Sequence, residues 1–222
     1  EKNMDTLNFK PVFLGQCIIK YEVPLDIFSS INKIYIKNYD NLARANKQLV
    51  GKIEKEHSLY YLGEDQTKIK NHNFLSTNVT DYFMQVFEHY LVFNSIKDYK
   101  TNLNSIWVNE MKQHEYNPTH VHQGSLFTGL SSVMILKLPS TYGVEYSAAD
   151  TPHNGKLQIL GSSSGQFAKM DYQPNLKERD FYVFPYDMRH TVYPFNSTDE
   201  VRRTLAANCD VDYNPINNRG AE

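Results

Sequence analysis

Two of the eight histidines in this 222-residue chain, His120 and His122, stand two residues apart in the segment EYNPTHVHQGS. In an extended strand the side chains of residues i and i+2 project from the same face, so the two imidazoles point the same way. Neutral imidazole is a good ligand for iron, zinc, copper or nickel. An HxH pair alone is more often solvated or hydrogen-bonded than metal-bound, so a metal site needs support from a third ligand.

The segment FPYDMRHTVYPF offers that third ligand in His190, which follows a hydrophobic strand ending at Pro185. Because His190 lies far along the chain from His122, the two residues are expected on strands that meet across a barrel rather than on the two arms of one hairpin. Three side chains on one face of a metal leave three positions open, which is the arrangement that non-haem iron oxygenases need for a chelating cosubstrate and dioxygen. The other five histidines stand in polar, helical or loop-like segments and are expected to be structural or solvated: His57, His72, His89, His114 and His153.

The segment VRRTLAANCDV, twelve residues beyond His190, could bind a carboxylate. Arg202 and Thr204 alternate onto one face of a strand, where an arginine fork donates two parallel hydrogen bonds and a hydroxyl adds a third. Taken singly, Arg202 is more often a surface charge paired with a neighbouring acid. Arg203 is a competing candidate, and the spacing to Thr204 favours Arg202.

The hydrophobic period changes near residue 100, and this change sets the expected architecture. The first third contains a strand-like run, PVFLGQCIIKYEV, then a helical pattern after Pro24 and a second helical pattern from about Thr80. Short β-rich runs separated by Gly, Pro, Asn and Ser follow, and regularly spaced strands of this kind predict a sandwich or barrel. These runs are NSIWVNEM, LSSVMILKLP, KLQIL, RDFYVFP and RRTLAANCDVDY.

One compact unit is expected, with residues 1–100 as a strand and helix support layer, 101–215 as the β core and 216–222 as a tail. The Gly/Ser-rich segment 161–166 is read as a mobile loop that is either a lid over a site or an idle surface loop.

The formal net charge of −2 and the lack of a basic run argue against a nucleic-acid partner. Cys17 and Cys209 do not have the spacing of a CxxC motif, and no signal peptide is recognised, so a reducing cytoplasmic location is expected. No apolar run approaches the roughly 20 residues that cross a bilayer. No membrane partner is therefore expected.

Together, IWVNEM, EYNPTHVHQG, SSVMILKLP, FYVFPYDMRHTVYPF and RRTLAANCDV, in this order, resemble the 2-oxoglutarate and Fe(II)-dependent oxygenases, in particular the prolyl-hydroxylase-like branch common in marine phages and bacteria. The resemblance covers roughly 106–211. It implies a double-stranded β-helix, a jelly-roll barrel braced by N-terminal helices. It also implies that His120 and His190 are metal ligands and that Arg202 and Thr204 hold the distal carboxylate of 2-oxoglutarate.

Three departures from the family pattern stand out. His122 occupies the position where the superfamily has Asp or Glu, so the resemblance implies either a triad of three imidazoles or a carboxylate supplied from elsewhere. Met134 and Ile135 stand where relatives often have tyrosines, and Asn109 is a candidate to replace the missing cosubstrate contact. The identity of the clamp, Arg202 or Arg203, stays open by one residue.

The resemblance implies hydroxylation of a C–H bond with Fe(II), 2-oxoglutarate and O2, and with ascorbate as an optional reductant. A prolyl residue of a protein or peptide is the first expected substrate, and a small molecule is the other. In a phage-like protein the location would be the host cytoplasm.

Three alternatives remain. A cupin-type metal protein that does not use 2-oxoglutarate would need a glutamate just past HxH, where Leu126 and Phe127 stand. A virion or scaffold jelly roll would leave the histidines idle. A nucleic-acid demethylase is disfavoured by the mildly acidic charge balance.

Overall fold

A computed structural model describes residues 15–45, 50–63, 69–148, 152–162 and 165–218 of the chain. The predicted lid at 161–166 includes residues 163–164, which lie outside the described part. In chain order the elements are β1 (Ile19–Glu22), α1 (Leu25–Asn38), the 3-10 helix η1 (Tyr39–Asn41), β2 (Ala43–Arg44), β3 (Lys55–Tyr61), β4 (His72–Asn73), α2 (Thr77–Phe93), β5 (Tyr99–Met111), β6 (Asn117–His120), β7 (Gly129–Lys137), β8 (Leu157–Leu160), β9 (Asp171–Tyr172), β10 (Asp180–Pro185), β11 (Arg189–Val192) and β12 (Arg202–Tyr213).

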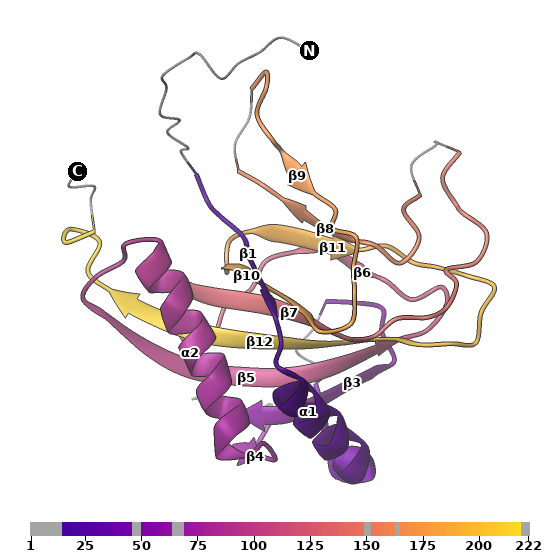
Figure 1. The fold of residues 1–222 in the computed structure, drawn as a ribbon, viewed down its shortest axis with the longest axis horizontal. Coiled ribbons are helices and arrows are strands. Elements are labelled where there is room, and N and C mark those ends of the chain that lie inside the picture. The colour runs from indigo at the N-terminus through magenta and orange to yellow at the C-terminus, as the bar shows by residue number, and fades with distance from the viewer. Residues whose placement is uncertain (1–14, 46–49, 64–68, 149–151, 163–164, 219–222) are drawn as a thin grey trace.

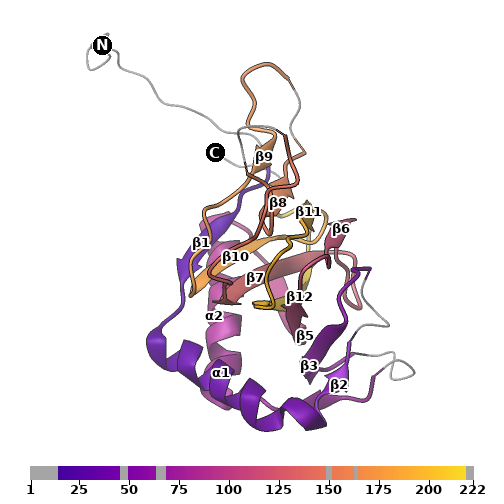
Figure 2. The ribbon, with the colours of Figure 1, turned by 90° about the vertical axis from the view of Figure 1, so that its right-hand side faces the viewer.

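The strands form two sheets that face each other across a common interior. The larger sheet has the order β1-β10-β7-β12-β5-β3-β2, with β4 added beside β3, and the smaller has the order β6-β11-β8-β9. Figure 2 shows the smaller sheet above the larger one, with both helices on the outer side of the larger sheet. The predicted double-stranded β-helix with N-terminal helices is therefore confirmed.

The helices cover the larger sheet because each presents an apolar stripe to it. In α2, Val79, Phe83 and Phe87 recur at helical spacing and are fully buried against the strands. Figure 1 shows α2 lying across β5 and β12, with α1 beside it. Both predicted helices are confirmed; α2 begins at Thr77, slightly earlier than expected, and the Ser76 carbonyl accepts the first helical hydrogen bond from Thr80 N–H.

The alternation of side chains along β12 divides the protein into two cores. Leu205, Ala207 and Cys209 join the core under the helices, whereas Thr204 and Ala206 turn toward the space between the sheets. The core between the sheets is apolar at one end, where residues such as Ile135 and Phe184 meet. The inward face of β12 therefore mixes polar and apolar residues, and this is where the candidate site lies.

The N-terminal third does more than form a support layer, because two of its strands also extend the larger sheet. β1 pairs with β10 and β3 pairs with β5, both antiparallel. Near the other end of the described chain, the side-chain amide N–H of Asn218 donates a hydrogen bond to the carbonyl of Lys97 at 2.8 Å.

Cys17 and Cys209 are both free thiols. Within the described residues, no helix combines the length and hydrophobicity needed to span a membrane.

Candidate active site

The three predicted metal ligands come together between the sheets. His120 ends β6, His190 lies directly opposite it on β11, and His122 lies just beyond β6. One nitrogen from each ring lies within 4.8 Å of the others, and the Nε2 atoms of His122 and His190 are 3.1 Å apart. The two strands are direct neighbours in one sheet rather than on opposite sides of the barrel, but they are not the two arms of one hairpin, as predicted. The register of β6 and β11 places these rings.

The spacing and orientation of these rings fit a metal ion. Nitrogens about 2.1 Å from a metal and at right angles to each other are about 3 Å apart. His120 Nδ1–H donates to the carbonyl of Pro118 at 2.6 Å, and His190 Nδ1–H donates to the carbonyl of Met188 at 3.1 Å. These bonds fix the tautomer that leaves each Nε2 lone pair free for a metal.

Burial keeps the three imidazoles neutral. It lowers the pKa of His190 to about 3, with a further contribution from the nearby His120. Burial also lowers the pKa of His120 and brings that of His122 well below its usual value. Because a proton competes with a metal for the same lone pair, neutral rings are ready ligands at neutral pH. Among the described residues the group contains no carboxylate.

The cavity beside the histidines is small and half apolar. It has a volume of about 40 Å³ and is lined on the larger sheet by Trp107, Asn109 and Thr204. Asn109 and Thr204 lie opposite each other on β5 and β12. In the described segments, the buried Asn109 Oδ1 and Trp107 Nε1 have no hydrogen-bond partner. The Trp107 ring lies 5.9 Å from that of His122.

The two adjacent arginines have different environments. Arg203 donates from Nε and Nη2 to Glu110 Oε1, at 2.8 and 2.5 Å, and its guanidinium lies 5.0 Å from the Tyr35 ring on the helix side of the sheet. Arg202 is 2% exposed, and its Nε and Nη2 have no hydrogen-bond partner within the described part of the chain. Burial lowers its pKa, and a hydrogen bond with the Tyr142 side chain opposes that effect. Arg202 is thus a buried guanidinium with free donors, as a carboxylate-binding residue requires.

Sequence reasoning missed Tyr142 and Trp107. Trp107 stands two residues before Asn109 on the same strand, so alternation alone could have indicated it. Tyr142 lies in the loop after β7, and no local pattern connects it with Arg202, sixty residues away. Of the two residues at the expected tyrosine positions, Ile135 faces the space between the sheets and Met134 joins the core under the helices.

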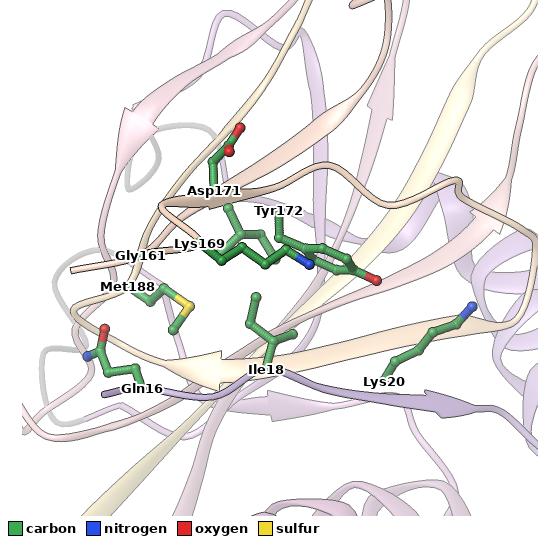
Figure 3. Close-up of a pocket in the computed structure, with 9 residues that line it drawn as sticks. Gln16, Ile18, Lys20, Gly161, Lys169, Asp171, Tyr172 and Met188 are labelled. Carbon is green, nitrogen blue, oxygen red and sulfur yellow. The ribbon is translucent and has the colours of Figure 1, made fainter. Parts of the chain in front are cut away.

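A larger cavity of about 320 Å³ lies away from the histidines, between the segment leading into β1 and the β8–β9 region. Figure 3 shows Lys169 and Tyr172 facing Ile18 across it. Its charged groups already have partners in the protein: Lys20 pairs with Asp180 at 2.7 Å, and Asp171 accepts a hydrogen bond from Gln158 at 2.7 Å. This cavity is larger than the one beside the histidines, but the histidine group and unpartnered polar atoms of the described residues lie at the smaller cavity.

Glu56 is a second buried charged side chain without a partner, and sequence reasoning missed it as well. It lies on β3 directly opposite Asn109 and is 1% exposed, and neither carboxylate oxygen has a hydrogen-bond partner among the residues that the structure describes. Burial, with a smaller contribution from Glu115, raises its pKa from 4.5 to about 7. A row across the larger sheet thus runs from Glu56 through Asn109 to Thr204.

We expect Glu56→Gln to stabilise the protein at pH 8 but not at pH 4.5. Because the folded-state pKa of Glu56 is raised, its favourable contribution is complete below about pH 4.5 and is lost as the pH rises through 7. After a reduction for solvent screening, the free energy of unfolding is expected to rise by about 1–2 kcal/mol at pH 8. Each kcal/mol raises the Tm by about 2–4 °C. Thermal melts of the metal-free protein at both pH values measure it. The exposed Glu54→Gln is the control, and equal Tm differences at the two pH values would contradict the expectation.

Comparison with known proteins agrees with this geometry. Residues 105–208 match the model of a family described as putative 2OG-Fe(II) oxygenase. No curated protein sequence matches the chain.

Three solved structures share the fold at low sequence identity. A prolyl-4-hydroxylase from Pseudomonas putida is 10% identical, with a TM-score of 0.52 over 90% of this chain and 93% of its own. A Trichoplax adhaerens prolyl hydroxylase in complex with a hypoxia inducible factor peptide is 11% identical, with a TM-score of 0.52 over 88% and 83%. HygX from Streptomyces hygroscopicus, with nickel, 2-oxoglutarate and hygromycin B bound, is 9% identical, with a TM-score of 0.50 over 88% and 82%. The barrel segment, residues 105–208, thus matches the model of the 2OG-Fe(II) oxygenases, enzymes that use Fe(II), 2-oxoglutarate and O2.

Proposed function

We propose that this chain is an Fe(II)- and 2-oxoglutarate-dependent hydroxylase in which His120, His122 and His190 hold the iron and Arg202 holds the far carboxylate of 2-oxoglutarate. The observation that carries the proposal is the Arg202 guanidinium, which is buried with two nitrogens that lack partners among the described residues, in the same barrel as the histidine group. A buried, unpaired cation is costly unless an anion joins it. The cupin-type alternative does not by itself account for this buried cation.

The bound iron and 2-oxoglutarate supply oxidising chemistry that converts O2 and the cosubstrate into succinate, CO2 and a hydroxylated C–H bond of the substrate. The chain's own residues bind and orient. The three imidazoles would hold the metal, and as only three ligands they would leave positions for the cosubstrate and O2. Arg202, aligned by Tyr142, and the Thr204 hydroxyl bind the carboxylate, and Asn109 adds a polar contact at the cavity wall. Trp107 and Val133 keep the cavity poor in water.

The neutral triad has an electrostatic consequence for binding. In the expected family pattern one ligand carries a negative charge, whereas here all three are uncharged, so the metal retains its full double charge toward its other ligands. A dianionic cosubstrate compensates that charge. We therefore expect 2-oxoglutarate to bind more strongly to the metal-loaded protein than to the metal-free protein.

The test is an anaerobic titration of the Fe(II)-loaded protein with 2-oxoglutarate, followed by exposure to O2. Chelation by the keto and adjacent carboxylate oxygens is expected to produce a weak visible charge-transfer band, and O2 is expected to yield succinate. If iron binds but neither band nor succinate appears, the cupin-type alternative replaces this proposal. If iron does not bind, the scaffold alternative does.

Prolyl peptides are the first substrates to add in the O2 stage of this experiment. The support is the fold shared with the two prolyl hydroxylases, one of which holds a peptide, whereas the similar HygX holds a small molecule, hygromycin B. Fold similarity at such low identity is an analogy, so the assay compares proline-containing peptides with small molecules. A gain of one oxygen atom on proline, dependent on 2-oxoglutarate, supports the peptide assignment. Oxidation confined to small molecules rejects it.

A further inference from the structure

The barrel holds a second unpaired charge, opposite in sign to Arg202. Glu56 on β3 is 1% exposed, and both of its oxygens lack a hydrogen-bond partner among the described residues. The carboxylate of Glu115, which is also acidic, adds to the effect of burial in raising the pKa of Glu56. Leaving a buried carboxylate without donors costs stability, so a purely structural role gives no reason for a carboxylate here. The Glu56 carboxylate is suited to accept hydrogen bonds from a bound ligand.

The position of Glu56 connects it with the reactive cavity. It shares one face of the larger sheet with Asn109 and Thr204, both of which line the cavity beside the histidines. Neighbouring strands are about 4.8 Å apart, so Glu56 and Thr204, with β5 between them, have backbones about 10 Å apart. Arg202 lies two residues before Thr204 on β12 and points to the same face of the sheet. The row therefore has an acidic end at β3 and approaches the basic Arg202 at β12.

The acidic β3 end and the basic Arg202 end of this row favour different ligands. A dicarboxylate such as 2-oxoglutarate is attracted by Arg202 and repelled by Glu56. A molecule that occupies the β3 end needs hydrogen-bond donors, because Glu56 offers two acceptor oxygens and the neighbouring Asn109 Oδ1 offers a third that is also without a partner. A protonated nitrogen provides several donors and a compensating charge, and charge-assisted hydrogen bonds are the strong ones.

We propose that Glu56 binds a protonated nitrogen of the substrate, so that the substrate class is molecules with an ammonium or guanidinium group, such as a peptide with a lysine or arginine side chain at the site. This inference rests on the proposed function, because it assigns Glu56, next to the cavity-lining Asn109, to the substrate of that reaction. The carboxylate fixes the basic group, and the carbon chain of the substrate extends from it toward the histidines. A prolyl peptide fits this subsite only if it carries a basic group as well.

The test compares two probes that differ only in the charged nitrogen: N-acetyl-lysine methylamide and N-acetyl-norleucine methylamide. Binding is measured by calorimetry to the protein loaded with Co(II) and 2-oxoglutarate, and again to the metal-free protein. The wild type is expected to prefer the lysine probe by about tenfold or more, the scale of one hydrogen bond to a charged group. Glu56→Gln is expected to abolish this preference while leaving norleucine binding unchanged.

The control is Glu54→Gln, an acid-to-amide change two residues away that removes an exposed carboxylate paired with Lys112. It is expected to keep the wild-type preference. Glu56→Met serves as a second variant if the glutamine variant fails to fold. The inference is overturned if the wild type shows no preference, or if the preference survives in the folded Glu56 variants.

The two proposals fail in different ways. If the metal-loaded wild type does not bind 2-oxoglutarate, the proposed function fails. The lysine preference of the metal-free protein, and its loss on changing Glu56, still reports separately on the subsite.

Discussion

Replacing His190 with alanine is expected to abolish retention of Fe(II). His190 is 3% exposed, and its Nε2 lies 3.1 Å from that of His122, so its loss removes one of three neutral ligands and leaves two. Loss of a hydrogen bond to a ligand commonly weakens metal binding about 10–100-fold, so loss of the ligand itself is expected to exceed about 100-fold. Metal content after desalting, and the Tm increase produced by excess Co(II) as a stable substitute, are the measurements.

The control is His89→Ala, which removes an exposed imidazole on α2 that contacts Tyr21 rather than the cavity. This variant is expected to retain iron and the Co(II)-dependent rise in Tm. His120→Ala is expected to behave like His190→Ala, because the two residues lie opposite each other on paired strands. Wild-type iron content in both variants, with a folded circular dichroism spectrum, would reject the metal assignment.

Replacing Arg202 with methionine is expected to remove 2-oxoglutarate binding while leaving the metal in place. Truncating one partner of a buried charge pair costs about 2–4 kcal/mol, so the Kd for 2-oxoglutarate is expected to rise about 30- to 1000-fold. The Tm without ligand is expected to hold or rise, because the variant no longer buries two unpartnered N–H groups. A substitution that lowers the affinity for 2-oxoglutarate without lowering the Tm identifies a residue that binds the ligand.

Arg203→Met provides the matched comparison one residue away. It leaves Glu110, which is 6% exposed, without its ion pair, so it is expected to lower the Tm while 2-oxoglutarate affinity stays within about threefold of wild type. Calorimetric titration of both variants with 2-oxoglutarate separates the two roles. The opposite result, with affinity lost in Arg203→Met and retained in Arg202→Met, would move the carboxylate clamp to Arg203.

The elements could be predicted because their signals are local. The period of Val79, Phe83 and Phe87 in α2, and the alternating strands from β5 to β12, follow from burying one helix stripe or one sheet face. The order of the motifs likewise indicated a jelly roll. The extension of the larger sheet by β1 and β3 carried no such signal, because pairing with β10 and β5 depends on segments far away in the chain.

The sequence by itself determined which chemistry-bearing residues share a face: His120 with His122, and Arg202 with Thr204, since alternation needs no tertiary contact. Only the tertiary structure decided what each residue meets. The register of β6 with β11 placed His190 beside His120, and Glu110 engaged Arg203 while Arg202 kept free donors. Tyr142 and Glu56 reached the same interior from a loop and a distant strand. The physical reason is that local period follows from backbone geometry, whereas the register between strands and the burial of a charge depend on the packing of the whole barrel.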